Sequence, residues 1–338
     1  MLKNIREKIR LSRLKKYQDE KKIIFMLSPD HGNLGDQLIA VATLKLLKEK
    51  YKDKIIIEIT RKSYERNKDI IKNIITGKDT LILCGGGNLG DIWLNEEVSR
   101  REVIDEYKNN KIIIMPQTIN FLSKKEENIS KKIYGKAEDL TIITREKESF
   151  KIGKENFINN KILLAPDIAF YLEDAYIKEL SDERDGAILL MRNDPEKIVT
   201  AGILKKIKSI LKSKKLGIKV SNTVVDSRGK INVKNREEIC LNLLKEISNH
   251  KLVITDRLHG MIFAVITNTP VIVFGSPISK TMGTIKWLSH LNYISYVDDF
   301  HDLDLIDKEI ERLLKIEVVK KKYKVKEEIN NIFEKIFF

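Results

Sequence analysis

Cysteine is almost absent from this sequence, since Cys84 and Cys240 are the only two among 338 residues. Two cysteines so far apart exclude a disulfide-stapled scaffold and a zinc site built from thiolates. So few cysteines are typical of a reducing compartment, and we expect a cytoplasmic protein. Histidine is scarce as well: the five histidines are dispersed, and no pair has the spacing of a metal site. We therefore predict no metal.

Long apolar runs are also missing. No stretch approaches the ~20 consecutive apolar residues that a transmembrane helix needs. The first residues, MLKNIREKIRLSRLKKYQ, contain neither an apolar core nor a small-residue cleavage site, so we expect no secretory signal. Apolar residues still make up 42% of the 338 residues. This length and content predict a globular protein with two domains of ~150 residues each.

Basic residues outnumber acidic ones, and the formal net charge is +14. Such a charge fits nucleic acid, an anionic membrane surface or small anionic substrates. A nucleic-acid-binding protein usually gathers its basic residues on one face and carries a recognisable module. Here the lysines are scattered over polar helix faces, and the sequence contains no zinc finger, aromatic RNA-binding signature or basic zipper. We therefore expect no nucleic-acid partner.

The basic charge is densest in residues 1–22, where nine Lys or Arg against three acidic residues leave a net charge of +6. Apolar residues recur near helical spacing at Leu2, Ile5, Ile9 and Leu14, with Leu11 off that stripe. A basic amphipathic helix can lie on an anionic membrane surface. The stripe is thin and contains no Trp or Phe, which favours a solvated helix packed on the following domain. Peripheral membrane association and a purely structural helix both stay open.

Short β-branched runs alternate with longer helical patterns along the chain. Strands are predicted at residues 22–27, 54–60, 80–84, 111–115 and 140–144, and again at 187–191, 217–225, 251–255 and 270–274. The alternation predicts an α/β protein of right-handed βαβ units with parallel sheets. A polar stretch at 172–186 interrupts it. We therefore expect two Rossmann-like domains, 23–175 and 186–312, preceded by a basic helix in 1–22 and followed by a helix in 313–338.

The pentapeptide GNLGD occurs twice, at residues 32–36 and 87–91, each time after an apolar run. Ligands of parallel α/β sheets bind outside the carboxyl ends of the strands, where both copies are expected. Glycine lets backbone N–H groups approach a ligand closely, and a helix N-terminus favours an anion. Asp36 and Asp91 are each expected in the first turn of a helix. There they either serve a ligand or simply cap the helix.

The run GGGNLG at residues 85–90 also matches the dinucleotide fingerprint G-x-G-x-x-G. That fingerprint requires an acidic residue at the end of the next strand, about 20 residues further on. Here Pro116, Gln117 and Thr118 follow the predicted strand, and no carboxylate occupies the place. We therefore expect no nicotinamide or flavin cofactor.

The segment KLVITDRLHGMIFAVITNTPVIVFG, residues 251–275, predicts a strand, a tight turn, a helix, a second turn and another strand. Asp256 is placed to cap the helix that Arg257 opens. An arginine at that helix end can fork onto a carboxylate or phosphate, and His259 can transfer a proton near neutral pH. The alternative for His259 is a structural histidine packed against its neighbours.

These motifs together resemble those of the polysaccharide pyruvyl transferase family. The resemblance rests on TDRLHG with IFAVITNTPVIVF, on HGNLGD and GGGNLGD, and on PQTINF, TREKES, APDIAF and MRND at 116–121, 144–149, 165–170 and 191–194. It implies two Rossmann-like domains in the GT-B glycosyltransferase architecture. It also implies an enzyme of exopolysaccharide or capsule biosynthesis that needs no cofactor. Such an enzyme transfers the enolpyruvyl part of phosphoenolpyruvate, its co-substrate, to a sugar, forming a ketal and releasing phosphate.

The resemblance also implies roles for individual residues. It maps the donor site onto Arg192, Arg257, Leu258 and His259, and two arginines suit a donor with a carboxylate and a phosphate. We expect His259 to act as general acid or proton shuttle, and Asp36 or Asp91 to orient or deprotonate the acceptor. The glycine loops are expected to bind the sugar acceptor, free or lipid-linked, through His31, Asn33, Gly35, Asp36, Gly86, Gly87, Asn88 and Asp91.

Two other functions fit the same residues. A glycosyltransferase of this fold would hold the diphosphate of a nucleotide sugar with the same arginines and helix ends. A non-catalytic scaffold of a polysaccharide assembly complex would tolerate changes of Arg257 and His259 without any change in the polymer. Release of phosphate from phosphoenolpyruvate, against release of a nucleoside diphosphate, separates the two enzymes.

Overall fold

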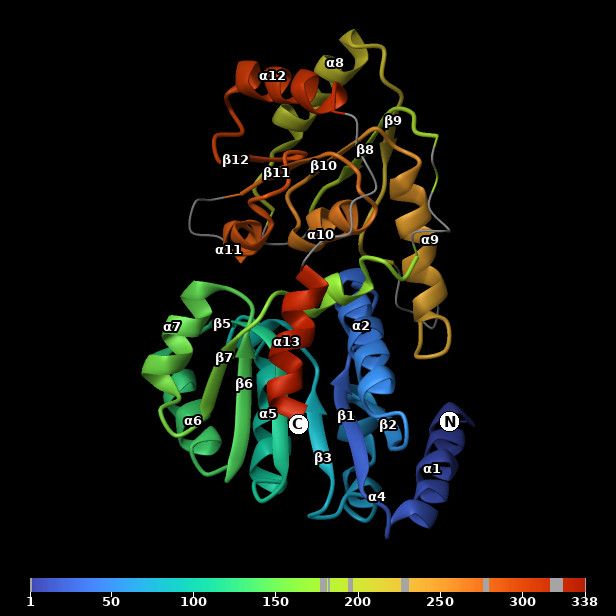
Figure 1. Ribbon diagram of the computed structural model, residues 1–338, viewed down its shortest axis with the longest axis vertical. Helices are drawn as coiled ribbons and strands as arrows, with labels where there is room; N and C mark the ends of the chain where they lie inside the picture. The colour runs from blue at the N-terminus through green and yellow to red at the C-terminus, as the bar shows by residue number, and fades with distance from the viewer. Residues whose placement is uncertain are drawn as a thin grey trace. The chain divides into compact units, whose positions relative to one another are not determined.

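The chain divides into two α/β units in the computed structural model, which describes residues 2–176, 181, 183–193, 197–225, 231–275, 280–316 and 325–337 (Figure 1). The first unit comprises Met1–His31 and Ile39–Ile168, and the second comprises Gly32–Leu38 and Ala169–Phe338. Each contains one parallel sheet, which confirms the expected pair of Rossmann-like domains. The first GNLGD copy, although it lies in the range 23–175, belongs to the second unit.

Seven strands form the sheet of the first unit, in the order β2-β1-β3-β5-β6-β7, with β4 paired to β5. All of the pairs are parallel. The bounds are β1 Lys22–Ser28, β2 Ile55–Thr60, β3 Thr80–Leu83, β4 Gly86–Gly90, β5 Lys111–Asn120, β6 Asp139–Thr144 and β7 Lys161–Leu164. The chain places β2 on one side of β1 and β3 on the other, so the topological switch point lies between β1 and β3. These two strands lead into the two GNLGD copies.

The core of this sheet explains which strands the sequence could predict. Isoleucine and leucine side chains fill its central strands, as is usual for a parallel sheet covered on both faces. Two strands were not predicted: β7 has only four residues, and β4 consists largely of glycine. Strand β5 also extends beyond the predicted 111–115 to Asn120, and its last residues pair with β4.

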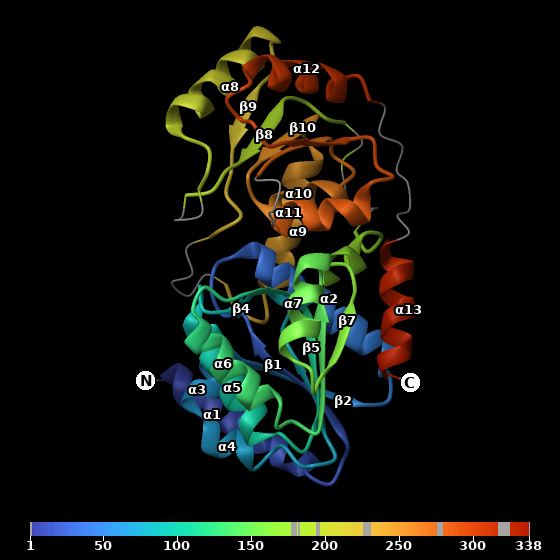
Figure 2. The ribbon, with the colours of Figure 1, turned by 90° about the vertical axis from the view of Figure 1, so that its left-hand side faces the viewer.

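Helices connect the strands of the first unit. Their bounds are α1 Leu2–Arg13, η1 Leu14–Tyr17, α2 Leu34–Lys50, α3 Arg61–Arg66, α4 Lys68–Lys72, α5 Leu94–Glu106, α6 Lys124–Tyr134 and α7 Lys147–Asn156. Figure 2 shows α5 and α6 side by side on one face of the sheet. Among the described residues, no helix combines the length and the apolar content needed to cross a membrane.

Helix α1 docks on the first unit through the residue that lies off its predicted apolar stripe. Leu11 is fully buried in the core, and Leu14 packs partly against it. Ile5 and Ile9 instead expose 49% and 48% of their surface. The helix is thus packed on the domain, as one interpretation expected, while Ile5 and Ile9 of its apolar stripe stay about half exposed.

Five parallel strands form the sheet of the second unit, in the order β12-β11-β10-β8-β9. The strands are β8 Ala187–Leu190, β9 Ile218–Val220, β10 Leu252–Thr255, β11 Val271–Phe274 and β12 Ile294–Val297. The helices are η2 Ile168–Leu172, α8 Ala201–Ser213, α9 Arg236–Ser248, α10 Leu258–Ile266, α11 Lys280–Ile285, η4 Lys286–Leu288, α12 Leu303–Leu314 and α13 Val325–Phe337. The switch point of this sheet lies between β8 and β10.

The C-terminal helix α13 is joined to the second unit through Lys326. Its ammonium group pairs with the Asp174 carboxylate at 2.8 Å and lies 4.9 Å from the ring centroid of Tyr171. Within the predicted helical range 313–338, α12 continues to Leu314 and α13 begins at Val325. Residues 317–324 between them lie outside the described residues.

Candidate active site

The candidate donor residues meet at the switch point of the second sheet. Arg192 follows β8 and Arg257 follows β10, and these strands are hydrogen-bonded neighbours. The backbone N–H of Arg192 donates to Asp256 Oδ1 at 2.7 Å, and Nε of Arg257 donates to the Met191 carbonyl at 3.5 Å. The fold thus brings together two arginines that the sequence separates widely, at the place where ligands of such sheets bind.

Asp256 joins the two strand ends and does not cap α10, so the predicted cap was wrong. Helix α10 starts at Leu258, and no side chain caps its N-terminus. The Arg257 N–H donates instead to Thr255 Oγ1 at 3.0 Å. Burial raises the pKa of the Asp256 carboxyl. The hydrogen bond from the Arg192 N–H and the positive charges of Arg192 and Arg257 lower this pKa, but burial has the larger effect. The capping prediction failed because a neighbouring strand offers the carboxylate a backbone donor.

His259 lies in the first turn of α10 and packs against the first GNLGD copy. A Cβ atom placed on Gly35 would stand 2.3 Å from Cγ and 2.4 Å from Nδ1 of the His259 ring. Only glycine leaves room for an imidazole so close to the backbone. The N-terminal turns of α2 and α10 therefore meet at this pair. Gly35, which was expected on the acceptor side, lies beside His259, which was expected on the donor side.

Backbone contacts hold the first GNLGD copy in place. Leu34 N–H donates to the Thr223 carbonyl at 2.7 Å, and Val225 N–H donates to the Gly32 carbonyl at 2.9 Å. A Cβ on Gly32 would lie 1.8 Å from the Val225 oxygen, so glycine is required there as well. These contacts anchor the start of α2 to the chain that follows β9.

The polar side chains of this copy bond to one another. Asn33 Oδ1 accepts the Gly35 N–H at 3.1 Å, and Asn33 Nδ2 donates to Asp36 Oδ2 at 2.7 Å. Asp36 lies in the first turn of α2, as predicted, and is half-buried. His31, at the last residue before this copy, is half-buried and is assigned to the first unit.

The second GNLGD copy adopts a different structure, because residues Gly86–Gly90 form strand β4. Gly90 has φ +148°, and a Cβ there would lie 1.7 Å from the Asn120 carbonyl oxygen. Asp91 does not enter a helical turn, and that prediction was wrong: α5 begins only at Leu94. The Asp91 carboxylate instead accepts the backbone N–H groups of Leu122 at 2.7 Å and Ser123 at 2.6 Å. This copy also departs from a dinucleotide loop, whose glycines turn directly into a helix.

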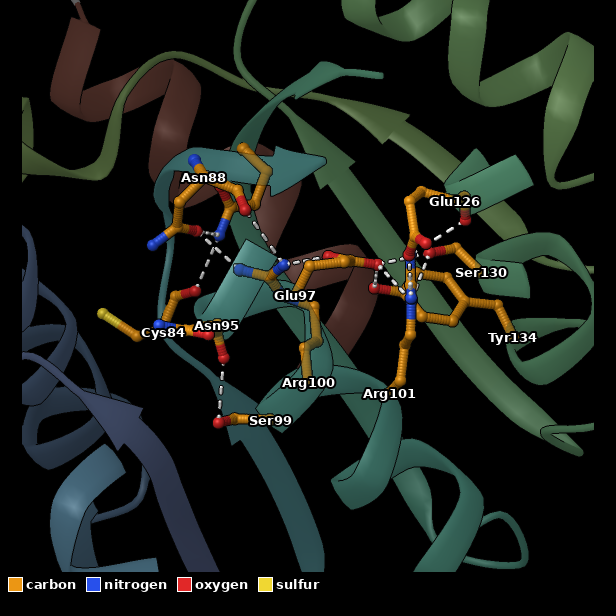
Figure 3. A network of polar contacts seen from close by, with 11 residues as sticks. Cys84, Asn88, Asn95, Glu97, Ser99, Arg100, Arg101, Glu126, Ser130 and Tyr134 are labelled. Carbon is orange, nitrogen blue, oxygen red and sulfur yellow. Dashed lines mark hydrogen bonds and ion pairs between the residues drawn. The ribbon is translucent and has the colours of Figure 1, made fainter. Parts of the chain in front are cut away.

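Asn88 of the second copy is held by a buried polar network (Figure 3). Its Oδ1 accepts from Arg100 Nη2 at 2.5 Å and from Gln117 Nε2 at 3.2 Å. Gln117 Nε2 also donates to the Cys84 carbonyl at 2.9 Å. Arg100 pairs with Glu97, which is fully buried and also accepts from Ser130 and Tyr134. This network was not predicted from the sequence, although Glu97 and Arg100, three residues apart, form a pattern that predicts an ion pair on a helix.

Comparisons with known proteins identify the family of this chain. The profile of the family described as Polysaccharide pyruvyl transferase matches residues 33–277. The chain belongs to this family. It is similar to General stress protein 30 of Bacillus subtilis, with 35% identity over 304 residues, 88% of this chain and 87% of that protein. It is also similar to Pyruvyl transferase 1 of Schizosaccharomyces pombe, with 26% identity over 270 residues, 75% of this chain and 66% of that protein.

A solved structure supports the fold of this pyruvyl transferase family member. The crystal structure of protein KP1_0663 from Klebsiella pneumoniae has a TM-score of 0.55 and 21% identity, covering 86% of this chain and 98% of that one. This likeness concerns the fold alone. Family membership makes the chain a transferase of polysaccharide biosynthesis.

Other motifs of the pyruvyl transferase family are connected through Arg145, which is almost fully buried. Its Nε donates to Thr118 Oγ1 at 2.9 Å, and its Nη1 pairs with the Asp167 carboxylate at 2.6 Å. The motifs PQTINF, TREKES and APDIAF are therefore joined at the carboxyl ends of β5, β6 and β7. Arg145 was not predicted as a member of this cluster. Among the described residues, no group of three His, Cys, Asp or Glu side chains could hold a metal ion.

Proposed function

We propose that this protein transfers a pyruvyl group from phosphoenolpyruvate to two hydroxyls of a sugar in a growing exopolysaccharide or capsule chain. The observation that carries the proposal is the meeting of Arg192, Arg257 and His259 at the switch point of the second sheet. Phosphoenolpyruvate presents a carboxylate and a phosphate, and each can accept two parallel hydrogen bonds from a guanidinium. The first turn of α10 adds partial positive charge at the same place.

The proposed reaction needs one proton donor and two attacking hydroxyls. His259 protonates the methylene carbon C3, and a sugar hydroxyl adds to C2 and returns a proton to His259. The C2–O bond to phosphate then breaks, and phosphate leaves with the bonding electrons. The second hydroxyl attacks C2 and closes the ketal, and its proton leaves with phosphate or with Asp36. In this proposal Asp91 supports the fold, because its carboxylate binds two backbone N–H groups.

The acceptor is a sugar, and we propose that it is carried on a lipid at the cytoplasmic face of a membrane. Support comes from helix α1, whose Ile5 and Ile9 are about half exposed. Ile9 also lines a pocket of about 540 Å³. The lining of this pocket is basic and partly apolar: Arg6, Ile9, Arg10, Arg13, Leu14, Lys16 and Tyr17. Exposed apolar side chains among arginines and lysines are typical of helices that bind anionic lipid.

A donor screen tests the proposed reaction. The purified protein is incubated with extracted lipid-linked oligosaccharides and either phosphoenolpyruvate or a set of nucleotide sugars. We expect phosphate release from phosphoenolpyruvate and an oligosaccharide that gains the mass and the acidity of a pyruvate ketal. Release of nucleoside diphosphate, with no reaction of phosphoenolpyruvate, would instead establish a glycosyltransferase.

A further inference from the structure

We propose that Asn88 and Trp93 form a subsite that binds a pyranose ring of the acceptor. That the ligand is a sugar rests on the proposed function. The geometry of the subsite rests on residues of the first unit alone. Asn88 supplies hydrogen-bond donors to sugar hydroxyls, and Trp93 supplies an aromatic face for the ring. Arg100 is a positioning residue in this subsite, because it acts through Asn88.

The first observation is the fixed direction of the Asn88 carboxamide. A guanidinium has only donors, so the amide atom 2.5 Å from Arg100 Nη2 must be the oxygen. Gln117 is fixed in the same way, because its Nε2 faces the carbonyl oxygen of Cys84. The Asn88 NH₂ group must therefore face away from both partners. It makes no hydrogen bond among the described residues, and the residue is half-buried. Two N–H donors are thus held ready for an oxygen atom of a ligand.

The second observation is that the ion pair holding Asn88 is buried, which costs hydration free energy. The side chains of Glu97 and Arg100 are 0% and 4% exposed, so both charges are removed from water. A buried ion pair adds little net stability compared with apolar residues of the same size. This pair is further held by Ser130 and Tyr134, which donate to Glu97 at 2.5 and 2.9 Å. Such a network is best explained by the orientation that it imposes on Asn88 (Figure 3).

The third observation is a set of exposed apolar side chains at and near the end of the same loop, which we name the Trp93 surface: Ile92, Trp93, Leu94, Val98 and Leu122. Trp93 exposes 51% and Leu122 exposes 79% of their surface. Leu94 and Val98 lie one turn apart on α5, and the Leu122 N–H bonds to Asp91. A half-exposed tryptophan beside further exposed apolar residues of the same segment offers a ligand an aromatic face.

A pyranose ring is the occupant whose chemistry fits both features. The axial C–H groups of a pyranose form an apolar face with partial positive charge, which suits the negative face of an indole ring. The hydroxyls at the rim of the same ring can accept from the Asn88 NH₂ group. An anionic lipid surface fits less well, because Asp91 and Glu96 stand on either side of Trp93 in the chain.

Tryptophan fluorescence tests this subsite without any transfer reaction. The chain has two tryptophans, so Trp287→Phe leaves Trp93 as the only one. This variant is titrated with the methyl pyranosides of glucose, galactose, mannose and N-acetylglucosamine, and with sorbitol as an acyclic control. We expect a saturable change in Trp93 emission with at least one pyranoside and none with sorbitol. The absence of a saturable change with every pyranoside, or a change with phosphatidylglycerol vesicles only, would overturn the proposal.

Asn88→Asp supplies the matched variant. One carboxylate oxygen can keep the bonds to Arg100 and Gln117, while the second oxygen replaces the NH₂ group. We expect an unchanged or higher Tm and about tenfold weaker pyranoside binding. Arg100→Lys should weaken pyranoside binding when introduced into the wild type. In the Asn88→Asp variant it should cause little further loss of affinity, because both changes act on the side-chain amide of Asn88. Independent effects of the two changes would show that Arg100 does not position Asn88. Sugar binding without turnover of phosphoenolpyruvate would leave the subsite standing and refute the proposed donor.

Discussion

The imidazole ring of His259 rests against the Cα of Gly35, and an ideal Cβ at Gly35 would lie 2.3 Å from the ring. The two residues come from the first turns of α10 and α2. Gly35 of the motif HGNLGD therefore contacts His259, the proposed proton donor, and limits the positions that its ring can take. The role of HGNLGD on the acceptor side stays a prediction. In the second unit, Gly35 of this motif leaves room for the His259 ring.

Gly35→Ala should impair catalysis more than stability. The added methyl group must push the His259 ring away, and a displacement of about 1 Å can cost ~100-fold in rate. We expect kcat to fall while KM for phosphoenolpyruvate changes little. Steady-state kinetics and the pH profile of kcat measure the effect. Gly217→Ala is the matched control, because no atom lies within 4 Å of a Cβ at that position. Full activity of Gly35→Ala would show that Gly35 is not needed to position His259 for catalysis.

Arg257→Lys should weaken donor binding. The lysine keeps the charge but loses the planar fork that binds a carboxylate or phosphate through two N–H groups. We expect KM for phosphoenolpyruvate to rise about tenfold or more, equivalent to ~1.4 kcal/mol. Arg184→Lys is a suitable control, since Arg184 bonds to the carbonyls of Thr267 and Asn268 and should affect Tm only. Unchanged donor kinetics in a folded Arg257→Lys protein would remove Arg257 from the site.

Chelation of metal ions should leave activity intact. In the proposed site the negative charge of the donor is balanced by Arg192, Arg257 and the N-terminus of α10. We expect equal rates of phosphate release before and after EDTA treatment. Loss of activity in EDTA, restored by magnesium or manganese, would show that carboxylates such as Asp36 hold a cation and that the roles proposed here need revision.

The docking of α13 should make stability depend on pH. Burial raises the pKa of Glu173 to about 8, while the N–H of Lys326 opposes the shift. A raised pKa means that the folded state favours the protonated carboxyl. This contribution is complete below the unfolded pKa near 4.5 and is lost as the pH rises through 8. We therefore expect a lower free energy of unfolding at pH 9 than at pH 7.

Urea unfolding at the two pH values measures this dependence. Glu173→Gln should remove most of it, because a glutamine stays neutral and can still accept the Lys326 N–H. Glu237→Gln serves as the control, since Glu237 is an exposed carboxylate that accepts from the Tyr176 hydroxyl at 2.9 Å. An identical pH dependence in wild type and Glu173→Gln would rule Glu173 out as its origin.

Helix α1 should give weak, salt-sensitive binding to anionic membranes. Each basic residue near such a surface contributes ~1 kcal/mol, and salt screens the attraction. We expect co-sedimentation with phosphatidylglycerol vesicles at low salt and much less at high salt. Ile5→Ser with Ile9→Ser should reduce binding without loss of stability, because both side chains are about half exposed. Leu11→Ser is the contrasting variant, since that residue is buried and should lower Tm. Equal sedimentation of wild type and the double variant would make α1 purely structural.

The amino-acid sequence by itself determined the secondary structure of the sheet cores. Runs such as KIIFML and TLILC are short and rich in β-branched and leucine residues, which indicates buried strands, and β1 and β3 lie where they were predicted. The alternation with helical patterns likewise determined two parallel sheets and their βαβ order. The order of the motifs was enough to identify the family.

Tertiary structure alone decided which secondary structure the two identical pentapeptides adopt and which partners individual polar side chains bind. The pentapeptide GNLGD starts a helix at residues 32–36 and forms most of a strand at 87–91, because different neighbours offer hydrogen bonds to the two copies. Asp91 lies outside the helical turn expected for it, and Asp256 does not cap the helix expected for it, because each carboxylate accepts a backbone N–H group of another segment. Local sequence determines which residues avoid water, since that depends on hydrophobic periodicity. The choice of polar partner depends on atoms that only the complete fold brings within hydrogen-bonding distance.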